Sequence, residues 1–501
     1  MWIRDVDVPL ALIEAHKAGR LVIFVGAGAS RGAPASLPDF RTLTSQIAAE
    51  TQIMPTDTDL DQPDVFLGRL DDGPVDVHGQ IARHLDLASS QPNQLHEAIA
   101  RLAIAGPAIR LVTTNYDEHL SKTLSMVGAT VDEYQGPALP LGDDFTGLVY
   151  LHGRLSQEPR HLVATDRDFG RAYLTAAWAA RFLERMFATY SVLFIGYSHG
   201  DVVMRYLARA LGPKTAGRFV LTDQPEEPDW KRLGLQPVAF PNVEGTFSAL
   251  TDAIAGWASW ASMGLLAHRQ RIANLVAAPP APVPEESSYL EHAVADEQTV
   301  RLFVELARGE AWLLWATRQP EFQRLFDPTA ERTACSDPLA RWFAQHFVMD
   351  EELSAAALAV VRDTGGRLGP PLRDAIGQRL HMADLPRKPW LGPWLLLLMD
   401  REPAQPTRWL EYALTSCRWP EDRTDALLLF DQLTQPQAVL QRSYGLESPP
   451  RFDIALPGSA HWLSDAWNAI FRPHLDDAAP DLLAIADGTA ARIGDRLGQA
   501  A

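Results

Sequence analysis

Cysteine is scarce in this chain, and its scarcity excludes two kinds of stabilising chemistry. The sequence of 501 residues contains two cysteines, Cys335 and Cys417. Two cysteines cannot form the disulfide framework of a small secreted protein or a zinc site with four cysteine ligands. No other residue pattern suggests metal ligands, so we expect no metal.

Long hydrophobic runs are missing as well. The most apolar stretch lies around residues 394–399 and is far shorter than the ~20 residues of a membrane-spanning helix. The N-terminal segment mixes acidic and basic side chains with apolar ones, unlike the hydrophobic segment of a signal peptide. These absences predict a cytoplasmic protein without a membrane partner.

An excess of positive charge is also lacking. The formal net charge is −18 at pH 7, because 63 Asp and Glu outnumber 45 Lys and Arg. A surface of this sign repels the phosphate backbone, so direct nucleic-acid binding is not expected, although a local basic groove stays open. The hydrophobic fraction of 47% indicates a folded, core-rich chain, and the length suggests two or three domains.

Short β-branched runs alternate with helical patterns in the first part of the chain. Strand-like runs begin at Leu21, Ile109, Leu148, Val192, Arg218 and Pro237. Helical patterns cover residues 93–103, 166–190 and 201–211. Continuous apolar strands that alternate with helices are typical of a parallel sheet covered on both faces. We therefore predict a Rossmann-like, doubly wound α/β domain over residues 1–270.

The composition changes at the proline-rich segment AAPPAPVPEESS, residues 277–288. Proline lacks a backbone donor and favours extended chain, so we expect a linker here. Beyond it, Val300, Phe303, Val304 and Ala307 follow the i, i+3, i+4, i+7 spacing of a helix. We predict a mainly α-helical C-terminal domain over residues 289–501, with a sensing or oligomerisation role.

A glycine-rich turn follows the first strand-like run. Its sequence is GAGAS at residues 26–30, followed by Gly32, and such a turn lets backbone amides approach a pyrophosphate. The G-x-G-x-x-x-G spacing is one residue longer than the dehydrogenase fingerprint, and no strand ending in an acidic residue follows about 20 residues later. A hydride-transferring dehydrogenase is therefore disfavoured, and a simple tight turn remains an alternative.

Polar residues follow several other predicted strands. TTNYD occupies residues 113–117, LHG residues 151–153 and GYS residues 196–198, while LPDFR at residues 37–41 follows the glycine turn. Because the carboxyl ends of parallel strands line one crevice, we expect Asn115, Asp117 and His152 to converge on the glycine turn. Simpler roles stay open: Asp117 could cap a helix, Asn115 could belong to a turn, and His152 could be a core histidine.

Taken together, these segments resemble the Sir2 (sirtuin-like) superfamily. GAGAS, LPDFR, TTNYD, LHG and GYS stand in the family's order, and TTNYD is most similar to bacterial Sir2-like domains that destroy NAD in anti-phage defence. The helix over residues 93–103, with His96 facing inward, is similar to the helix before this motif. Protein-deacylating sirtuins carry a module with four zinc-binding cysteines, but no cysteine precedes Cys335 here. The resemblance therefore implies NAD hydrolysis rather than deacylation.

The resemblance also implies catalytic roles. Cleavage of the nicotinamide–ribose bond passes through an oxocarbenium-like transition state, and nicotinamide leaves as a neutral molecule without a general acid. Asn115 would position the water or the ribose hydroxyls, and Asp117 would hold Asn115 or the nicotinamide amide. His152, with a pKa near its ordinary value, would act as the base.

Residues that would bind NAD come from the same matching segments. They are Gly26, Ala27, Gly28, Ser30, Asp39, Phe40, Arg41, Thr114, Gly196, Ser198 and Asp223. Phe40 would cover the nicotinamide pocket, and Arg41 would contact phosphate or close the loop. Ser198 would bind ribose or phosphate, and Asp223 would accept the hydroxyls of the adenosine ribose.

The predicted function is that of an NAD+ glycohydrolase, with NAD as a substrate that is split into nicotinamide and ADP-ribose. The resemblance implies a triggered, NAD-depleting effector of anti-phage defence, working as a homo-oligomer or with a partner defence protein and activated by a phage-derived trigger. Alternatives are a non-enzymatic module that binds NAD or ADP-ribose and, less favoured, a protein deacylase or ADP-ribosyl transferase. The histidines His119, His161 and His199 are expected at the surface.

Overall fold

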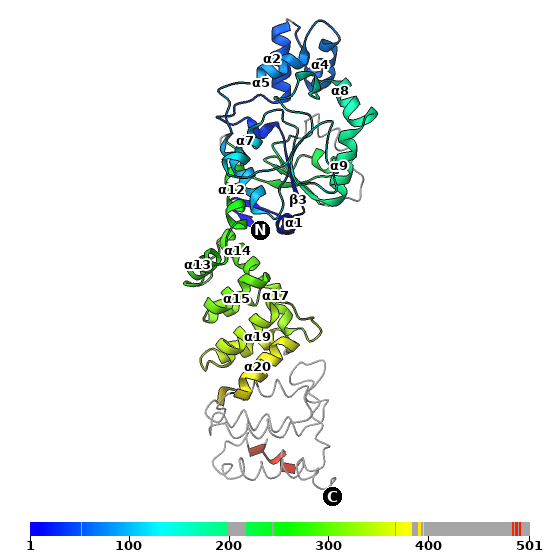
Figure 1. Cartoon of the computed structure of the whole chain (residues 1–501). Coiled ribbons are helices and arrows are strands. Elements are labelled where there is room, and N and C mark those ends of the chain that lie inside the picture. The colour runs from blue at the N-terminus through cyan, green and yellow to red at the C-terminus, as the bar shows by residue number, and fades with distance from the viewer. Residues whose placement is uncertain are drawn as a thin grey trace. The chain divides into compact units, whose positions relative to one another are not determined.

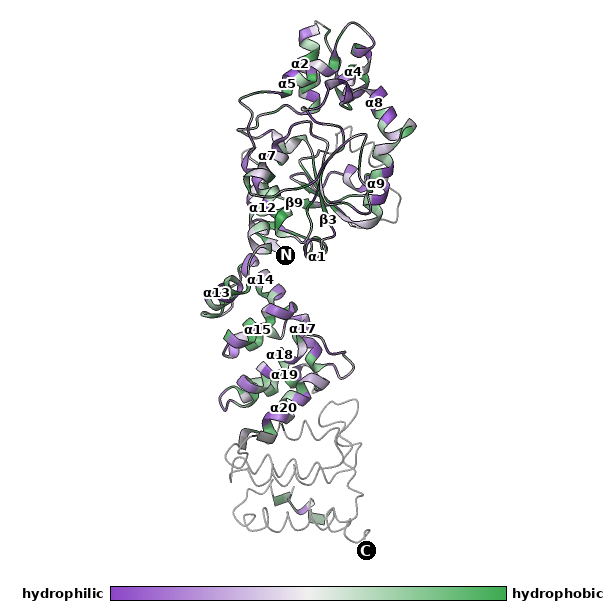
Figure 2. Ribbon diagram, in the orientation of Figure 1, coloured by the Kyte–Doolittle hydropathy of each residue, from purple (hydrophilic) through white to green (hydrophobic). Residues whose placement is uncertain are grey.

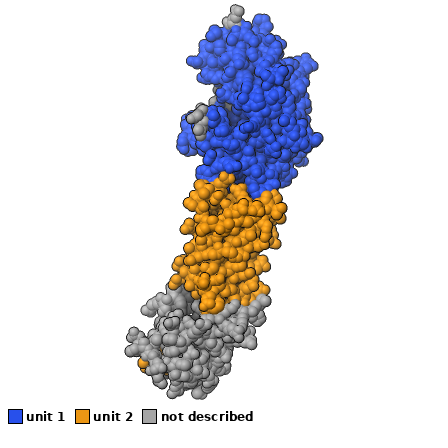
Figure 3. Space-filling view, turned by 90° about the vertical axis from the view of Figure 1, so that its left-hand side faces the viewer, with its two compact units in different colours: residues 1–263 blue, residues 264–501 orange. Residues whose placement is uncertain are grey.

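Two compact units, Met1–Met263 and Gly264–Ala501, make up the chain (Figure 3). The computed structural model describes residues 1–51, 53–198, 217–242, 245–365, 367–382, 389–391, 394, 483–484, 486–488 and 490–491. The predicted helix over residues 201–211 and His199 lie outside the described residues. The domain boundaries expected from the sequence stay a prediction.

A parallel sheet of seven strands forms the centre of the N-terminal unit (Figure 1). Its strands, in chain order, are β3 (Leu21–Val25), β4 (Arg110–Thr113), β5 (Glu133–Gln135), β6 (Gly147–Tyr150), β7 (Ser191–Ile195), β8 (Arg218–Thr222) and β9 (Gln236–Ala239). They lie in the order β5-β6-β4-β3-β7-β8-β9, and all neighbours are parallel. The predicted doubly wound parallel sheet is confirmed. Strand β5 was not predicted from the sequence, because its three residues, EYQ, form no apolar run and are partly exposed.

Helices cover both faces of this sheet, as its continuous apolar strands require. One face carries α1 (Leu10–Lys17), α6 (Gln94–Ala105) and α12 (Ser248–Ala261) (Figure 1). His16 of α1 contacts Trp257 of α12, and α7 (His119–Met126) packs on α6. The other face carries α9 (Trp178–Thr189), whose Phe182 and Phe187 share a core with Phe24. Short elements complete the unit: β1 (Trp2–Ile3), β2 (Val6–Asp7), η1 (Ala27–Ser30), η2 (Pro159–His161) and α11 (Asp229–Arg232).

A small helical cluster lies beside the segments that follow β4 and β6. It contains α2 (Phe40–Thr51), α3 (Asp57–Asp61), α4 (Pro63–Asp71) and α5 (Val77–Leu85). Its core includes Ile47, Phe66 and Ile81, and Tyr116 and Leu162 pack into it from the segments after the strands. The cluster therefore adjoins the carboxyl edge of the sheet.

The segment between β6 and β7 departs from its prediction. One long helix was expected over residues 166–190, but the structure has α8 (Asp166–Gly170), the π-helix η3 (Arg171–Thr175) and then α9. The break falls at Ala177, whose φ of 50° is left-handed and cannot continue a right-handed helix. The break separates α9, which covers the sheet, from the shorter helices near the site.

The described part of the C-terminal unit is mainly helical, as predicted. Its elements are α13 (Leu265–Val276), α14 (Pro284–Ala295), α15 (Glu297–Leu306), α16 (Glu310–Ala316), α17 (Pro320–Gln323), η4 (Arg324–Phe326), α18 (Ser336–Phe343), the π-helix η5 (Ala344–Val348), α19 (Ser354–Asp363), α20 (Pro370–Met382) and η7 (Pro389–Leu391). Helix α14 begins at Pro284, inside the segment expected to be a linker. An aromatic core that includes Phe303, Phe322 and Trp342 holds this unit together.

The helices of both units carry hydrophilic and hydrophobic residues side by side (Figure 2). This pattern is typical of helices that bury one face and expose the other. Within the described ranges, no helix combines the length and the apolar composition needed to cross a membrane.

Shortening Phe24 tests the importance of the buried sheet. Its ring is fully buried and lies 5.0 Å from that of Phe194 and 5.8 Å from that of Tyr197, measured between centroids. Phe24→Ala should lower the free energy of unfolding by about 3–5 kcal/mol, measured by denaturant titration of the full chain. Leu174→Ala, at a side chain that is 74% exposed, should change it by less than about 0.5 kcal/mol. Equal losses in the two variants would contradict this packing.

Candidate active site

Strand register aligns the carboxyl ends of the central strands. Val25 of β3 pairs with Thr113 of β4 and with Ile195 of β7, and Thr113 pairs with Tyr150 of β6. The segments that follow, which contain the glycine turn, TTNYD, LHG and GYS, therefore leave the sheet at the same edge. After β3 the chain forms β4, β5 and β6 on one side of that strand and then β7, β8 and β9 on the other side. In open α/β sheets, ligands bind at such a switch point, beside the carboxyl ends of the strands.

The glycine turn packs closely against the GYS turn. The amide of Gly26 donates to the Ile195 carbonyl and that of Gly28 to the Gly196 carbonyl, both at 2.9 Å. A Cβ on Gly28 would lie 2.8 Å from the Gly196 oxygen, so only glycine allows this approach. These two amides were expected to face a pyrophosphate, but backbone carbonyls already occupy them. The glycines instead bring η1, with Ala27 and Ser30, over the strand ends.

Ser30, at the end of η1, is the centre of a buried hydrogen-bond network. Its Oγ lies 2.8 Å from Asp117 Oδ2, 3.2 Å from Asn115 Nδ2 and 3.2 Å from His96 Nε2. A carboxylate can only accept, so the Ser30 hydroxyl donates to Asp117 and accepts from the other two groups. The backbone N–H of Asn93 donates to His96 Nδ1 at 3.1 Å, which places the His96 proton on Nε2. Every donor and acceptor around Ser30 is thereby assigned.

This network fixes the orientation of the Asn115 amide. Its Nδ2 also donates to the Gly26 carbonyl at 3.2 Å, so both amide protons are used and Oδ1 faces the other way. Asn115 is 8% exposed, and its Oδ1 has no hydrogen-bond partner within the described part of the chain. A buried acceptor without a partner costs about 1–3 kcal/mol, which a bound ligand or water would recover. The oxygen therefore marks a position where a donor can bind.

Two further histidines surround the carboxylate of Asp117. His96 is fully buried, as expected, and burial lowers its pKa to about 4 against the opposing effect of Asp117. His119 is 3% exposed, so its predicted surface position was wrong. Its backbone N–H donates to Asp117 Oδ1 at 3.1 Å, and its Nε2 lies 2.8 Å from Ser90 Oγ. Burial also lowers the pKa of His119, so both rings are neutral at pH 7.

His152 follows β6, the strand beside the one that carries Asn115. Its side chain is 2% exposed, its Nε2 lies 2.9 Å from the Tyr173 hydroxyl, and its ring meets that of Phe169 edge-on at 5.2 Å. Burial lowers the pKa of His152 to about 3. The expected ordinary pKa is therefore wrong, because α8 and η3 cover the ring. The imidazole is nevertheless unprotonated at neutral pH, as a base must be.

Of the remaining predicted residues after the strands, Thr114 joins the strand ends, whereas Ser198 and Asp223 lie elsewhere. Thr114 Oγ1 lies 2.7 Å from the Tyr197 hydroxyl, which donates to the Val25 carbonyl at 3.2 Å. Ser198 is exposed at the end of the GYS turn. Asp223, after β8, accepts from the Asn242 side chain at 2.7 Å. Thr114 thus belongs to the scaffold around the site, and Asp223 lies on the other side of β7.

The LPDFR residues divide between the site and the surface. Asp39 accepts the Thr42 amide at 2.8 Å and so starts α2. Phe40 is half-buried and packs against the sheet-face core that contains Phe169 and Tyr173, and against the helical cluster as well. Arg41 is exposed and pairs with an aspartate of α3 at 2.6 Å. The structure therefore places Phe40 between the sheet-face core and the helical cluster, whereas Arg41 pairs with α3 at the surface.

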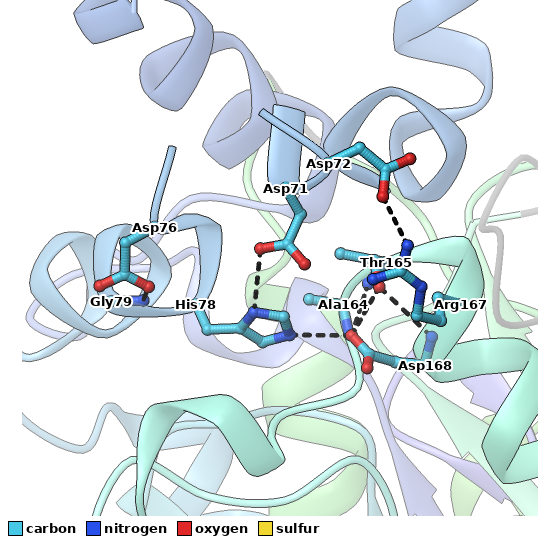
Figure 4. Close-up of polar contacts among 9 residues, drawn as sticks. All are labelled: Asp71, Asp72, Asp76, His78, Gly79, Ala164, Thr165, Arg167 and Asp168. Carbon is cyan, nitrogen blue, oxygen red and sulfur yellow. Dashed lines mark hydrogen bonds and ion pairs between the residues drawn. The ribbon is translucent and has the colours of Figure 1, made fainter. Parts of the chain in front are cut away.

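An ion-pair cluster, missed from the sequence, anchors the cover of His152. Figure 4 shows His78 of α5 between Asp71 of α4 and Asp168 of α8, at 3.6 Å and 2.8 Å. The hydrogen bond to Asp168 is the main reason that the pKa of His78 is raised, and it outweighs burial. Asp168 also accepts from Thr165, and although burial opposes the shift, these bonds hold its pKa low. Phe169, which covers His152, is the next residue along α8.

This edge of the sheet combines a topological switch point, a glycine turn, an oriented amide and a neutral imidazole, which together define a candidate dinucleotide site. Residues 109–236 match a family model described as a SIR2-like domain, so this segment is similar to the Sir2-like superfamily. The chain is also 29% identical over 307 residues to an uncharacterized protein, y4cA, of Sinorhizobium fredii. That match covers 54% of this chain and 25% of its relative, so the chain spans about a quarter of the relative's length.

The titratable groups at this edge form no metal-binding arrangement among the described residues. Within the described ranges, no group of three or more His, Cys, Asp or Glu side chains is arranged to hold a metal ion. His96, His119 and Asp117 lie close together, but Ser30, Ser90 and backbone groups already use both ring nitrogens of His96, Nε2 of His119 and the oxygens of Asp117. Of these atoms, only Nδ1 of His119 has no hydrogen-bond partner within the described residues. Their visible role is to orient Ser30 and, through it, Asn115.

Removing the Ser30 hydroxyl tests this network. Ser30→Ala removes one hydrogen-bond partner from each of Asn115, His96 and Asp117, so the free energy of unfolding should fall by about 1–3 kcal/mol in denaturant titration. Ser45→Ala removes an exposed hydroxyl that bonds only to its own helix, at Arg41, and is the matched control. It should change stability by less than about 0.5 kcal/mol. An unfolding midpoint of Ser30→Ala equal to that of the control would contradict the network.

Raising the pH should loosen the cover of His152. A raised pKa in the folded state means that the contribution of His78 is complete below its unfolded pKa of about 6.5 and is lost as the pH rises through the folded value. Hydrogen-exchange protection of α5 and α8, corrected for intrinsic rates, should therefore fall as the pH rises above about 6.5.

The variant His78→Gln should show little of this pH dependence, whereas His161→Gln, an exposed histidine of the neighbouring η2, should retain it. A pH dependence unchanged in His78→Gln would show that another group is responsible.

Proposed function

We propose that the protein is an NAD+ glycohydrolase, which uses water to split NAD+ into nicotinamide and ADP-ribose. The observation that carries the proposal is the unpaired Oδ1 of Asn115, held by Ser30 and Gly26 at the strand edge where His152 also lies. The match of residues 109–236 to a SIR2-like domain supports NAD as the substrate.

The oriented amide suits the developing charge of this reaction. As the bond between C1′ and the nicotinamide nitrogen breaks, its electron pair leaves with nicotinamide and the ribose becomes cationic. The Asn115 Oδ1 accepts a hydrogen bond from the attacking water or from a ribose hydroxyl and brings partial negative charge near that cation. Because Ser30 and Gly26 hold the amide before substrate binds, little reorganisation is needed.

His152 is suited to accept a proton late in the reaction, after water has bonded to C1′. Once the oxygen of water bonds to C1′, that oxygen carries a positive charge and is strongly acidic, so a weak base is sufficient. A buried imidazole with a pKa of about 3 is unprotonated at neutral pH and can accept this proton at Nε2. Its present partner there is the Tyr173 hydroxyl, so the water would replace Tyr173 or reach His152 through it.

The aromatic residues around His152 would keep bulk water out. Phe169 and Tyr173 stack at 6.0 Å, and Phe40 packs against the same core from α2. A dry pocket strengthens the electrostatic effect of the Asn115 dipole and limits water to the reacting molecule. The remaining expected contacts to NAD, made by Arg41, Ser198 and Asp223, belong to this proposal and would require those side chains to turn toward the ligand.

We further propose that this activity serves anti-phage defence and is switched on by a trigger, acting through an oligomer or a partner protein. The covered His152 supports a resting state that needs opening before it turns over. A non-enzymatic module that binds NAD or ADP-ribose is the second candidate, and the same burial of His152 favours it. The two differ in one outcome, which is nicotinamide release.

Nicotinamide release from NAD+, measured by chromatography on each species separated by size, tests the proposal. At least one species of the wild type should release nicotinamide and ADP-ribose in equal amounts. Asn115→Ala and His152→Ala should each slow release by about 100-fold or more. The controls Asn274→Ala and His161→Ala, at exposed side chains, should retain wild-type rates.

Two results would refute the glycohydrolase. One is saturable NAD binding without release in every species, which supports the binding module instead. The other is release that persists in both Asn115→Ala and His152→Ala.

A further inference from the structure

A cavity in the C-terminal unit is lined by arginines. Its volume is about 410 Å³, within the range of small-molecule sites. Four arginines, one histidine and a buried tryptophan stand among its lining residues: Arg301, Arg308, Arg341, Arg379, His346 and Trp342. They come from α15, α18, η5 and α20 and from Arg308 just after α15. This concentration of positive charge contrasts with the net charge of −18 of the whole chain.

Neutral oxygen atoms, rather than carboxylates, hold three of these arginines in place. Arg308 donates to the carbonyls of Val304, Glu305 and Ala307 at the end of α15, at 3.0, 2.6 and 2.6 Å. Arg341 donates to a backbone carbonyl of its own helix at 3.3 Å. Within the described ranges, no carboxylate lies within ion-pair distance of Arg308 or Arg341. Backbone carbonyls, and no salt bridge among the described residues, hold these two arginines; burial lowers the pKa of Arg308, and the charge of Glu305 opposes this from beyond ion-pair distance.

Arg379 and His346 complete the positive side of the cavity. Arg379 donates to the Gln345 side-chain oxygen at 2.8 Å and, within the described part of the chain, also has no carboxylate at ion-pair distance. Burial, followed by the charges of Arg308 and Arg379, lowers the pKa of His346 to about 4, while Asp350 opposes this.

The acidic residue that lines the cavity is already engaged. Both carboxylate oxygens of Glu305 accept from Arg269 of α13, at 2.7 and 2.8 Å. Arg301 pairs with Glu297 at 3.4 Å, on an exposed helix face. Three guanidinium groups therefore remain to face an anion. Guanidinium groups bind phosphate oxygens through paired N–H donors, and a pocket of this size can admit a small ligand that carries phosphate groups.

We propose that this arginine cavity binds a small ligand through its phosphate groups, with Arg308, Arg341 and Arg379 as the phosphate-binding residues. The proposal is independent of the activity of the N-terminal unit, which contributes nothing to the lining of the cavity. A ligand with two linked phosphates fits three separated guanidinium groups better than a single carboxylate does, because each phosphate offers several oxygen atoms to different arginines.

Sodium pyrophosphate is the probe for the test, used on the full chain with sodium chloride at equal ionic strength as reference. Calorimetry gives the affinity, and hydrogen exchange with mass spectrometry locates the site. Pyrophosphate should protect the segments of α15, α18 and α20, which separates this cavity from any binding at the glycine turn. The double variant Arg341→Gln/Arg379→Gln should lose that protection and bind about tenfold or more weakly.

Arg362→Gln, at an exposed arginine of α19 that does not line the cavity, is the matched control and should bind like the wild type. Far-ultraviolet circular dichroism and the melting temperature confirm that each variant is folded. Equal protection in the double variant and the control would overturn the proposal, as would protection of the N-terminal unit alone. Protection by a polyglutamate peptide but not by pyrophosphate would identify an acidic-peptide site and also overturn it.

Discussion

The orientation of one side-chain amide depends on the hydroxyl of Ser30. That hydroxyl has one proton to donate and room to accept twice, and Asp117, Asn115 and His96 use all three positions. Because the Gly26 carbonyl takes the second amide proton, Asn115 has a single orientation, with its oxygen unpaired. The neutral state of His96 is part of this arrangement, since protonation of Nδ1 would break its bond from the Asn93 backbone. A polar group buried without a partner reduces stability. The fold nevertheless keeps the unpaired Asn115 oxygen at the edge where α/β sheets bind ligands.

The same edge shows why the glycine turn is needed. Gly28 and Gly196 approach so closely that a side chain on Gly28 would collide with backbone, and this contact sets the height of η1 over the strands. Ser30 reaches Asp117 and Asn115 from that height. The glycines thus act mainly on the position of Ser30 rather than by offering their amides to a phosphate. The ion pair of His78 with Asp168 acts on the opposite side of the site, where it anchors the helix that covers His152.

Much of the N-terminal fold could be predicted from the sequence. Continuous apolar runs such as LVIFV at β3 and VLFIG at β7 are buried on both faces, and the segments after them meet at one edge as parallel strands require. The placement of Asn115 and His152 on neighbouring strands followed from the same rule. What failed depends on tertiary contacts. The burial of His119 and the low pKa of His152 arise from packing against other elements of the fold, and the break at Ala177 is a left-handed residue in a segment with helical periodicity. The pairing of His78 with Asp168 joins residues from separate elements and has no local signal.

A structure of the full chain with a non-hydrolysable NAD analogue, in which carbon replaces the ribose ring oxygen, tests the central claim most directly. The account predicts that a hydroxyl of the nicotinamide ribose, or a water beside C1′, lies within about 3.2 Å of Asn115 Oδ1, with the bonds of Ser30 unchanged. An analogue bound elsewhere, or bound at this edge with Asn115 Oδ1 still unpaired, would contradict it.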